Sequence, residues 1–110
     1  MKMSADCLQR GILMNNDVVT IRLVDKYLKL TDAAREKATR TVEEGTTEAR
    51  SLSDMLSMCD NYRIDAKHFL EKGDLVRAFG AINYAHAWLD AAVRIGWLDG
   101  HGDDNLFTLP

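Results

Sequence analysis

The fold is decided by residues 62–90, which read YRIDAKHFLEKGDLVRAFGAINYAHAWLD. An apolar pattern with helical spacing stops at Gly73, and a second one begins directly after Asp74. Glycine readily takes the left-handed backbone conformation that ends a helix, and aspartate caps the first turn of a new one. The stretch therefore predicts two antiparallel helices joined by a tight turn at Gly73 and Asp74.

The composition around this hairpin indicates an all-α protein. The chain has 110 residues, the size of one domain, and its single proline is the last residue. Alanine, leucine and the long charged residues that favour helices are abundant, whereas strand-like runs are scarce. The net charge of −3 argues against a sequence-independent nucleic-acid-binding protein, which would carry a basic face.

The cysteine count and the hydropathy pattern bear on the compartment. Two cysteines do not make a disulfide framework. No stretch approaches the run of about 18 apolar residues that a membrane span requires, and the apolar patch near the N-terminus is too short for a signal peptide. We therefore expect a cytoplasmic protein without membrane contact.

Two further helix boundaries precede the hairpin. Asn16 and Asp17 supply a start signal, and apolar residues then keep helical spacing until Gly45 ends the pattern. Thr46 or Thr47 can cap the helix that follows. Together with the hairpin, these signals predict an antiparallel up-down-up bundle of three helices.

The predicted bundle occupies residues 16–98. A short N-terminal segment, residues 1–15, has no strong period, and we expect it to be mobile or to form a short helix. A C-terminal tail, residues 99–110, is acidic and rich in glycine but ends in apolar residues. We expect one helical domain with two ends of different character.

The last helix, between Asp74 and Gly96, is apolar over most of its circumference. Such a helix is either central in its fold or shared with another subunit. Three helices cover only part of it, so we expect a fourth covering segment or a homo-oligomer, with a dimer favoured. Large aromatic and apolar groups dominate interface energies. The candidate contact residues are therefore Trp88, Trp97, Leu106 and Phe107.

Polar and aromatic side chains form a second pattern on the hairpin. One pair has i,i+3 spacing on the first helix and another has i,i+4 spacing on the second, so each pair reaches one spot on its helix. Because the helices are antiparallel, we expect the two spots to converge. The candidate pocket or polar network consists of Tyr62, Asp65, His68, Tyr84, His86 and Asp90.

This set has a structural and a functional interpretation. In the structural one, Asp65 and Asp90 satisfy His86, Tyr84 or backbone groups and fix the register of the hairpin. In the functional one, the set forms a ligand- or metal-binding pocket or a hydrolytic, nuclease-like site. Di-metal bundles use four or more inward carboxylates and two Glu-x-x-His motifs, which this chain lacks. No metal or other cofactor is therefore predicted.

Catalytic motifs give no support for an enzyme. The chain has no nucleophile motif, phosphate-binding loop or Cys-x-x-Cys pair. Small helical-bundle ribonucleases place an arginine and a histidine a few residues apart on one helix, whereas Arg77 and His86 are nine apart. We favour a non-catalytic interaction or scaffold module with an unidentified protein partner, and keep the nuclease-like site as the alternative.

The hairpin also carries a family resemblance. Its first helix and turn read YxxDAxxFLEKGD at residues 62–74, and its second helix reads YAHxxLDA at residues 84–91. These motifs resemble a family of small archaeal proteins catalogued as domain of unknown function 357, over approximately residues 21–96. The resemblance implies a cytoplasmic helical bundle of archaeal origin. It implies no activity, because the family has none assigned.

Overall fold

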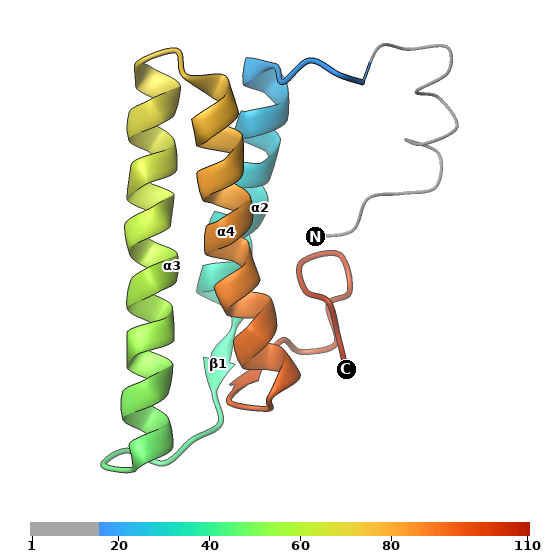
Figure 1. The fold of residues 1–110 in the computed structure, drawn as a ribbon. Helices are drawn as coiled ribbons and strands as arrows, with labels where there is room; N and C mark the ends of the chain where they lie inside the picture. Colours follow the sequence, from blue (N-terminus) through green and yellow to red (C-terminus); the bar gives the residue numbers. More distant parts are fainter. Residues whose placement is uncertain (1–15) are drawn as a thin grey trace.

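The computed structural model describes residues 16–110, and within them it shows an antiparallel bundle of three helices (Figure 1). Two short strands join the end of the first helix to the end of the last. The elements are α2 (Ile21–Lys37), β1 (Thr39–Arg40), α3 (Thr47–Glu71), α4 (Leu75–Arg94) and β2 (Leu98–Asp99). The predicted all-α, up-down-up bundle is confirmed. The N-terminal segment predicted at residues 1–15 lies outside the described residues.

Helix α2 begins later than the sequence pattern predicts. Its N-cap is Thr20, whose hydroxyl oxygen accepts a hydrogen bond from the Leu23 amide at 3.1 Å. The predicted start signal at Asn16 and Asp17 is therefore not the cap. A threonine at this position satisfies one of the four amide groups that the first turn of a helix leaves without partners.

Helix α2 also ends earlier, at Lys37, and does not continue to Gly45 as predicted. Ala38 takes an extended conformation, and the next two residues form β1, which pairs antiparallel with β2. A β-branched residue such as Thr39 favours a strand. The long-range pairing with β2 also satisfies backbone groups that a longer helix would have bonded internally.

The turn between α3 and α4 has the geometry of a Schellman motif. Gly73 has φ of 76°, and its amide donates a hydrogen bond to the Leu70 carbonyl at 3.0 Å. The Asp74 amide donates to the Phe69 carbonyl at 2.9 Å. The Asp74 carboxylate also accepts a hydrogen bond from the Arg77 amide at 3.2 Å, so Asp74 caps α4. One residue pair thus ends one helix and starts the next.

Helix α4 is central, because it packs against both α2 and α3. Its buried face combines large residues with the fully buried alanines Ala78, Ala85 and Ala92, whose small side chains let neighbouring helices approach closely. The core draws on all three helices and on the C-terminal segment. Its largest fully buried side chains are Phe107, Leu52, Ile82, Leu89, His86, Val24, Thr31 and Cys59.

The C-terminal segment, residues 99–110, folds back beside α4 (Figure 1). Phe107 is fully buried, and its ring packs onto Gly100 so closely that a Cβ atom at Gly100 would lie 2.8 Å from the ring. Phe107 is therefore a core residue and not the exposed contact group that its place in the sequence suggested. The segment supplies part of the cover that the apolar circumference of α4 requires.

Candidate functional site

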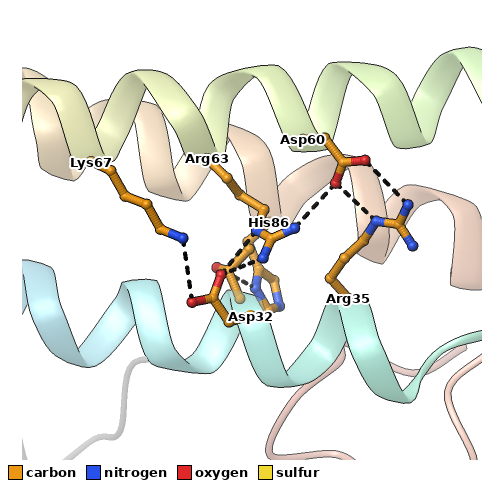
Figure 2. Close-up of polar contacts among 7 residues, drawn as sticks. Asp32, Arg35, Asp60, Arg63, Lys67 and His86 are labelled. Atoms are coloured by element: carbon orange, nitrogen blue, oxygen red, sulfur yellow. Dashed lines mark hydrogen bonds and ion pairs between the residues drawn. The ribbon is translucent and has the colours of Figure 1, made fainter.

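His86 lies at the junction of α2, α4 and the C-terminal segment, with a side chain only 1% exposed. Its Nδ1 atom is 2.9 Å from the hydroxyl oxygen of Thr31 on α2. Its Nε2 atom is 2.7 Å from the backbone carbonyl oxygen of Leu106. Figure 2 shows the imidazole between the helices, behind the charged side chains of α2 and α3. The ring thus ties three separate parts of the chain together.

The two hydrogen bonds determine the tautomer of His86. A carbonyl oxygen only accepts, so Nε2 carries the proton that is donated to Leu106. In the neutral ring Nδ1 is then an acceptor, and the Thr31 hydroxyl donates to it. Burial lowers the pKa of His86 from its ordinary value of 6.5, although the Asp90 carboxylate and the Leu106 carbonyl oppose this shift. Both ring nitrogens are occupied within the fold.

Asp90 holds the same segment at a second point. One carboxylate oxygen accepts a hydrogen bond from the Thr108 amide at 2.9 Å, and the same oxygen is 3.8 Å from His86 Nε2. His86 and Asp90, spaced i,i+4 on α4, therefore contact neighbouring backbone groups of the C-terminal segment. Their shared task in the structure is to hold Leu106 and Thr108 against α4.

An ion-pair network joins α2 to α3 in front of His86 (Figure 2). Arg35 on α2 donates two hydrogen bonds to Asp60 on α3, at 2.9 and 3.2 Å. Arg63 on α3 bridges Asp60, at 3.1 Å, and Asp32 on α2. Lys67 lies 3.8 Å from Asp32. Acidic and basic side chains alternate along the network, and they link the two helices at several points.

The pKa values of two residues at this network reflect its ion pairs and its burial. Burial alone would raise the pKa of Asp60, but hydrogen bonds from Arg35 and Arg63 lower it below its usual value. Beneath the network, burial raises the pKa of the Cys59 thiol to about 11. A buried thiol with so high a pKa is not a nucleophile at neutral pH. The cluster therefore favours helix packing over covalent chemistry.

The tyrosines predicted on facing helices meet at the seam between α3 and α4. The rings of Tyr62 and Tyr84 lie edge to face, with centroids 4.5 Å apart, and Tyr84 contacts Trp88 in the same manner at 5.9 Å. The indole N–H of Trp88 is buried without a hydrogen-bond partner in the described part of the chain. These three rings form an aromatic strip that is separate from His86.

The structure does not bring the remaining two members of the sequence-predicted set to His86. Asp65 and His68 are exposed on α3, and the hydrogen bonds of His86 go to Thr31 and Leu106 instead. The reason lies in the helical phase, because Ala66 and not Asp65 turns toward the core. The candidate set therefore divides into a buried His86–Asp90 pair, an aromatic strip and two exposed residues.

Sequence reasoning missed several participants. Thr31 interrupts the apolar stripe of α2, and that interruption was the available signal for a buried polar partner. Arg35 lies among other charged residues in the sequence, which gave no sign that it pairs with Asp60 across the helix interface. Leu106 contributes through its backbone carbonyl, which no sequence motif reveals.

The chemistry available at this site is limited. Among residues 16–110, no group of three or more His, Cys, Asp or Glu side chains is placed to hold a metal ion. His86 has no free ring nitrogen with which to abstract a proton, since both contact protein atoms. In the same part of the chain, no helix is both long and apolar enough to cross a membrane.

The outer face of α4 exposes several apolar side chains, the largest of which are Val76, Tyr84 and Ile95. The apolar and small residues that are exposed on this face follow one another at steps of four, four, three, four and four residues, which keeps them on one side of the helix. The arginines Arg77 and Arg94 are exposed on the same side. We call this surface the α4 stripe, and its members are Val76, Gly80, Tyr84, Ala87, Ala91 and the C-cap residue Ile95. A shallow groove beside it is lined by Ala87, Asp90, Ala91, Arg94 and Thr108.

Comparison with known proteins agrees with the hairpin and its motifs. A family described as protein of unknown function (DUF357) matches residues 26–98, which include most of α2 and all of α3 and α4. The chain belongs to the DUF357 family. No curated protein and no solved structure matches it. In this DUF357 protein the matched region ends at Leu98 in β2, so the segment that holds His86 through Leu106 lies beyond the family match.

Proposed function

We propose that this DUF357 protein is a non-catalytic interaction module that acts as a homo-oligomer through the α4 stripe. The observation that carries the proposal is the exposure of large apolar side chains along one helix face. Val76 is 74% exposed, Ile95 is 51% exposed and Tyr84 is 45% exposed. Exposed apolar side chains that share one helix face mark an interaction site more often than isolated exposed residues do.

The composition of the stripe supports a packed interface. Gly80, Ala87 and Ala91 are small and exposed, so a partner helix can approach the α4 backbone closely. Tyr84 supplies an aromatic anchor of the type enriched at interface hot spots. Trp88, partly buried next to Tyr84, holds that anchor in place.

Of the four contact residues proposed from the sequence, only Trp88 lies next to the α4 stripe. Trp88 borders the stripe, whereas Trp97 and Leu106 are partly buried against the core cluster and Phe107 is inside it. The buried state of His86 gives no support to a pocket, because a substrate would have to displace Thr31 or Leu106 to reach the ring. The setting we propose is the cytoplasm, in keeping with the buried free thiol of Cys59.

The mass of the protein in solution tests this function. Sedimentation or light scattering over a wide concentration range should give a mass above that of one chain for the parent. Ala91→Glu places a charge within the α4 stripe and should return the protein to a monomer without loss of helicity.

The matched control is Ala33→Glu, the same substitution at an exposed alanine on α2. It should leave the mass of the parent unchanged. A parent that is monomeric at every concentration, or an Ala91→Glu variant that associates as the parent does, would remove the proposal.

A further inference from the structure

We infer that residues 103–110, which we call the strap, open from α4 and close onto it as a unit while the three helices stay folded, and that His86 makes this opening sensitive to acid. The opening is a movement within one chain, so it does not depend on an interface at the α4 stripe. It uncovers the site that the ring of Phe107 fills in the core.

The strap is attached to the bundle by one fully buried side chain and by scattered polar contacts. Phe107 is that side chain, and no other residue of the strap is buried. The polar contacts come from separate residues of α2 and α4, namely Lys37, His86, Asp90 and Arg94. A segment that buries so little apolar surface has low local stability, so it opens before the structure that it covers.

The helices keep a core of their own when the strap opens. Val24 from α2, Leu52 from α3 and Leu89 from α4 are all fully buried and belong to one apolar cluster. The extent of the family agrees with this division, because the match ends at Leu98, before the strap begins. The three helices are therefore the unit that opening leaves intact.

The backbone between β2 and the strap is suited to act as a hinge. Gly100 follows β2 directly, and His101 and Gly102 then have φ of 57° and 70°. Glycine adopts a wide range of backbone conformations, and a left-handed residue with a side chain keeps its conformation only while its surroundings hold it. A change at these residues moves the strap and leaves the pairing of β1 with β2 in place.

The closed strap keeps water away from His86. The Leu106 carbonyl accepts a hydrogen bond from Nε2 at 2.7 Å, and the side chain of His86 is 1% exposed. Burial lowers the pKa of His86 below 6.5 in this closed form. Opening removes Leu106 and hydrates the ring, so the open form binds a proton more readily. Acid therefore favours the open form by linkage.

The charged groups around the imidazole do not reverse this direction. Asp90 is 3.8 Å from Nε2 and stays beside it in both forms, because the two residues share α4. The charged groups that α2, α3 and the strap bring are each paired with an opposite charge, so their effects on the ring partly cancel. These pairs are Asp32 with Arg63 and Lys67, Arg35 with Asp60, and Lys37 with Asp103 (Figure 2 shows the first two groups).

Amide hydrogen exchange of the full chain, resolved by residue, tests both parts of the inference. Exchange rates corrected for intrinsic pH dependence give an opening constant for the strap, from Phe107 and Thr108, and for α4, from Ile82 and Leu89. The strap constant should be at least about tenfold larger than that of α4. It should rise at least about threefold from about pH 7 to about pH 5.5, within the limit of about tenfold per pH unit for one proton.

Substitution of each histidine identifies the group that takes up the proton. His86→Gln keeps a donor for the Leu106 carbonyl but does not titrate. The chain has three histidines, so His68→Gln and His101→Asn are the matched controls, asparagine being chosen for the left-handed backbone of His101. The rise of the strap constant in acid should disappear in His86→Gln and persist in both controls.

Strap and α4 amides with the same opening constant at every pH would overturn the inference, because the strap would then open only with the bundle. A rise in acid that is unchanged in His86→Gln would overturn the role of His86. If His86→Gln does not fold, an NMR titration of the parent replaces it. An imidazole of His86 that titrates at or above its ordinary pKa of 6.5 in the parent would then contradict the inference, and one that titrates below it supports the inference.

Discussion

The imidazole Nε2 atom of His86 lies 2.7 Å from the backbone carbonyl oxygen of Leu106, twenty residues further along the chain. This contact attaches the C-terminal segment to the central helix, and the Thr31 hydroxyl on the other ring nitrogen extends it to α2. One side chain therefore links three parts of the fold. The effect of substituting His86 on stability can therefore distinguish a structural role of this residue from a functional one.

His86→Ala should lower the free energy of unfolding by roughly 1 to 3 kcal/mol, because it leaves the Thr31 hydroxyl and the Leu106 carbonyl without their partner. Urea denaturation followed by circular dichroism measures the change. The control is His68→Ala, an exposed histidine on α3, which should change stability by less than about 0.5 kcal/mol. A His86→Ala variant as stable as the parent, or a stoichiometric metal lost on substitution, would favour a working site.

The same histidine should make stability depend on pH. Burial lowers the folded-state pKa of His86 below its ordinary value of 6.5. Between that lower pKa and 6.5 the unfolded chain binds more protons than the folded one, so the free energy of unfolding rises with pH in this window. Stability should fall as the pH drops below 6.5, and the fall should be smaller in His86→Ala. Urea midpoints measured across this range would show an equal slope in both proteins if His86 were not the cause.

Arg63 should contribute more to stability than its neighbour Lys67. Arg63 bridges Asp32 and Asp60 and is 21% exposed, whereas Lys67 is 52% exposed and 3.8 Å from Asp32. Arg63→Met should cost about 1 to 2 kcal/mol, since it removes charge-assisted hydrogen bonds from two half-exposed carboxylates. Lys67→Met should cost less than about 0.5 kcal/mol. Equal effects in thermal melts would mean that Arg63 does not stabilise the contact between α2 and α3 more than the exposed Lys67 does.

Gly100→Ala should destabilise the protein although Gly100 has no left-handed backbone. Its new Cβ atom would lie 2.8 Å from the buried ring of Phe107, so the C-terminal segment must shift at a cost of about 1 to 3 kcal/mol. Combining it with Phe107→Leu should cost less than the sum of the two single changes, because the smaller side chain relieves the clash. Strict additivity in a double-mutant cycle would contradict the contact.

Gly73→Ala should lower stability by about 1 kcal/mol through the backbone alone. Gly73 has φ of 76°, and nothing lies within 4 Å of the position that a Cβ atom would take. The cost is therefore that of a left-handed conformation for a residue with a side chain. Gly73→Asn should cost less, because asparagine tolerates this conformation better than alanine does. Thermal melts of the two variants that coincide with that of the parent would mean that the turn is not as described.

Local signals in the sequence were sufficient for the hairpin. Helical periodicity, a glycine at the end of α3 and an aspartate at the start of α4 act within one turn of the chain, so residues 62–96 could be interpreted without knowledge of their surroundings. The same local rules gave the bundle topology and the cap of α3, since Thr46 accepts a hydrogen bond from the Ala49 amide. The family motifs lie in this region as well.

Tertiary contacts decided what local rules could not. Helix α2 stops at Lys37 because β1 finds a partner in β2, which lies far away along the chain. Local rules also could not predict which polar groups contact His86. Asp65 and His68 face solvent, whereas the Thr31 side chain and a backbone carbonyl reach His86. Periodicity places a residue on a face of its own helix, but the free energy of a buried polar group depends on the partners that other segments bring to it. The sequence by itself therefore determined the helices and their order. Only the packing of the C-terminal segment and α2 onto α4 determined that His86 is buried and hydrogen-bonded to both of them.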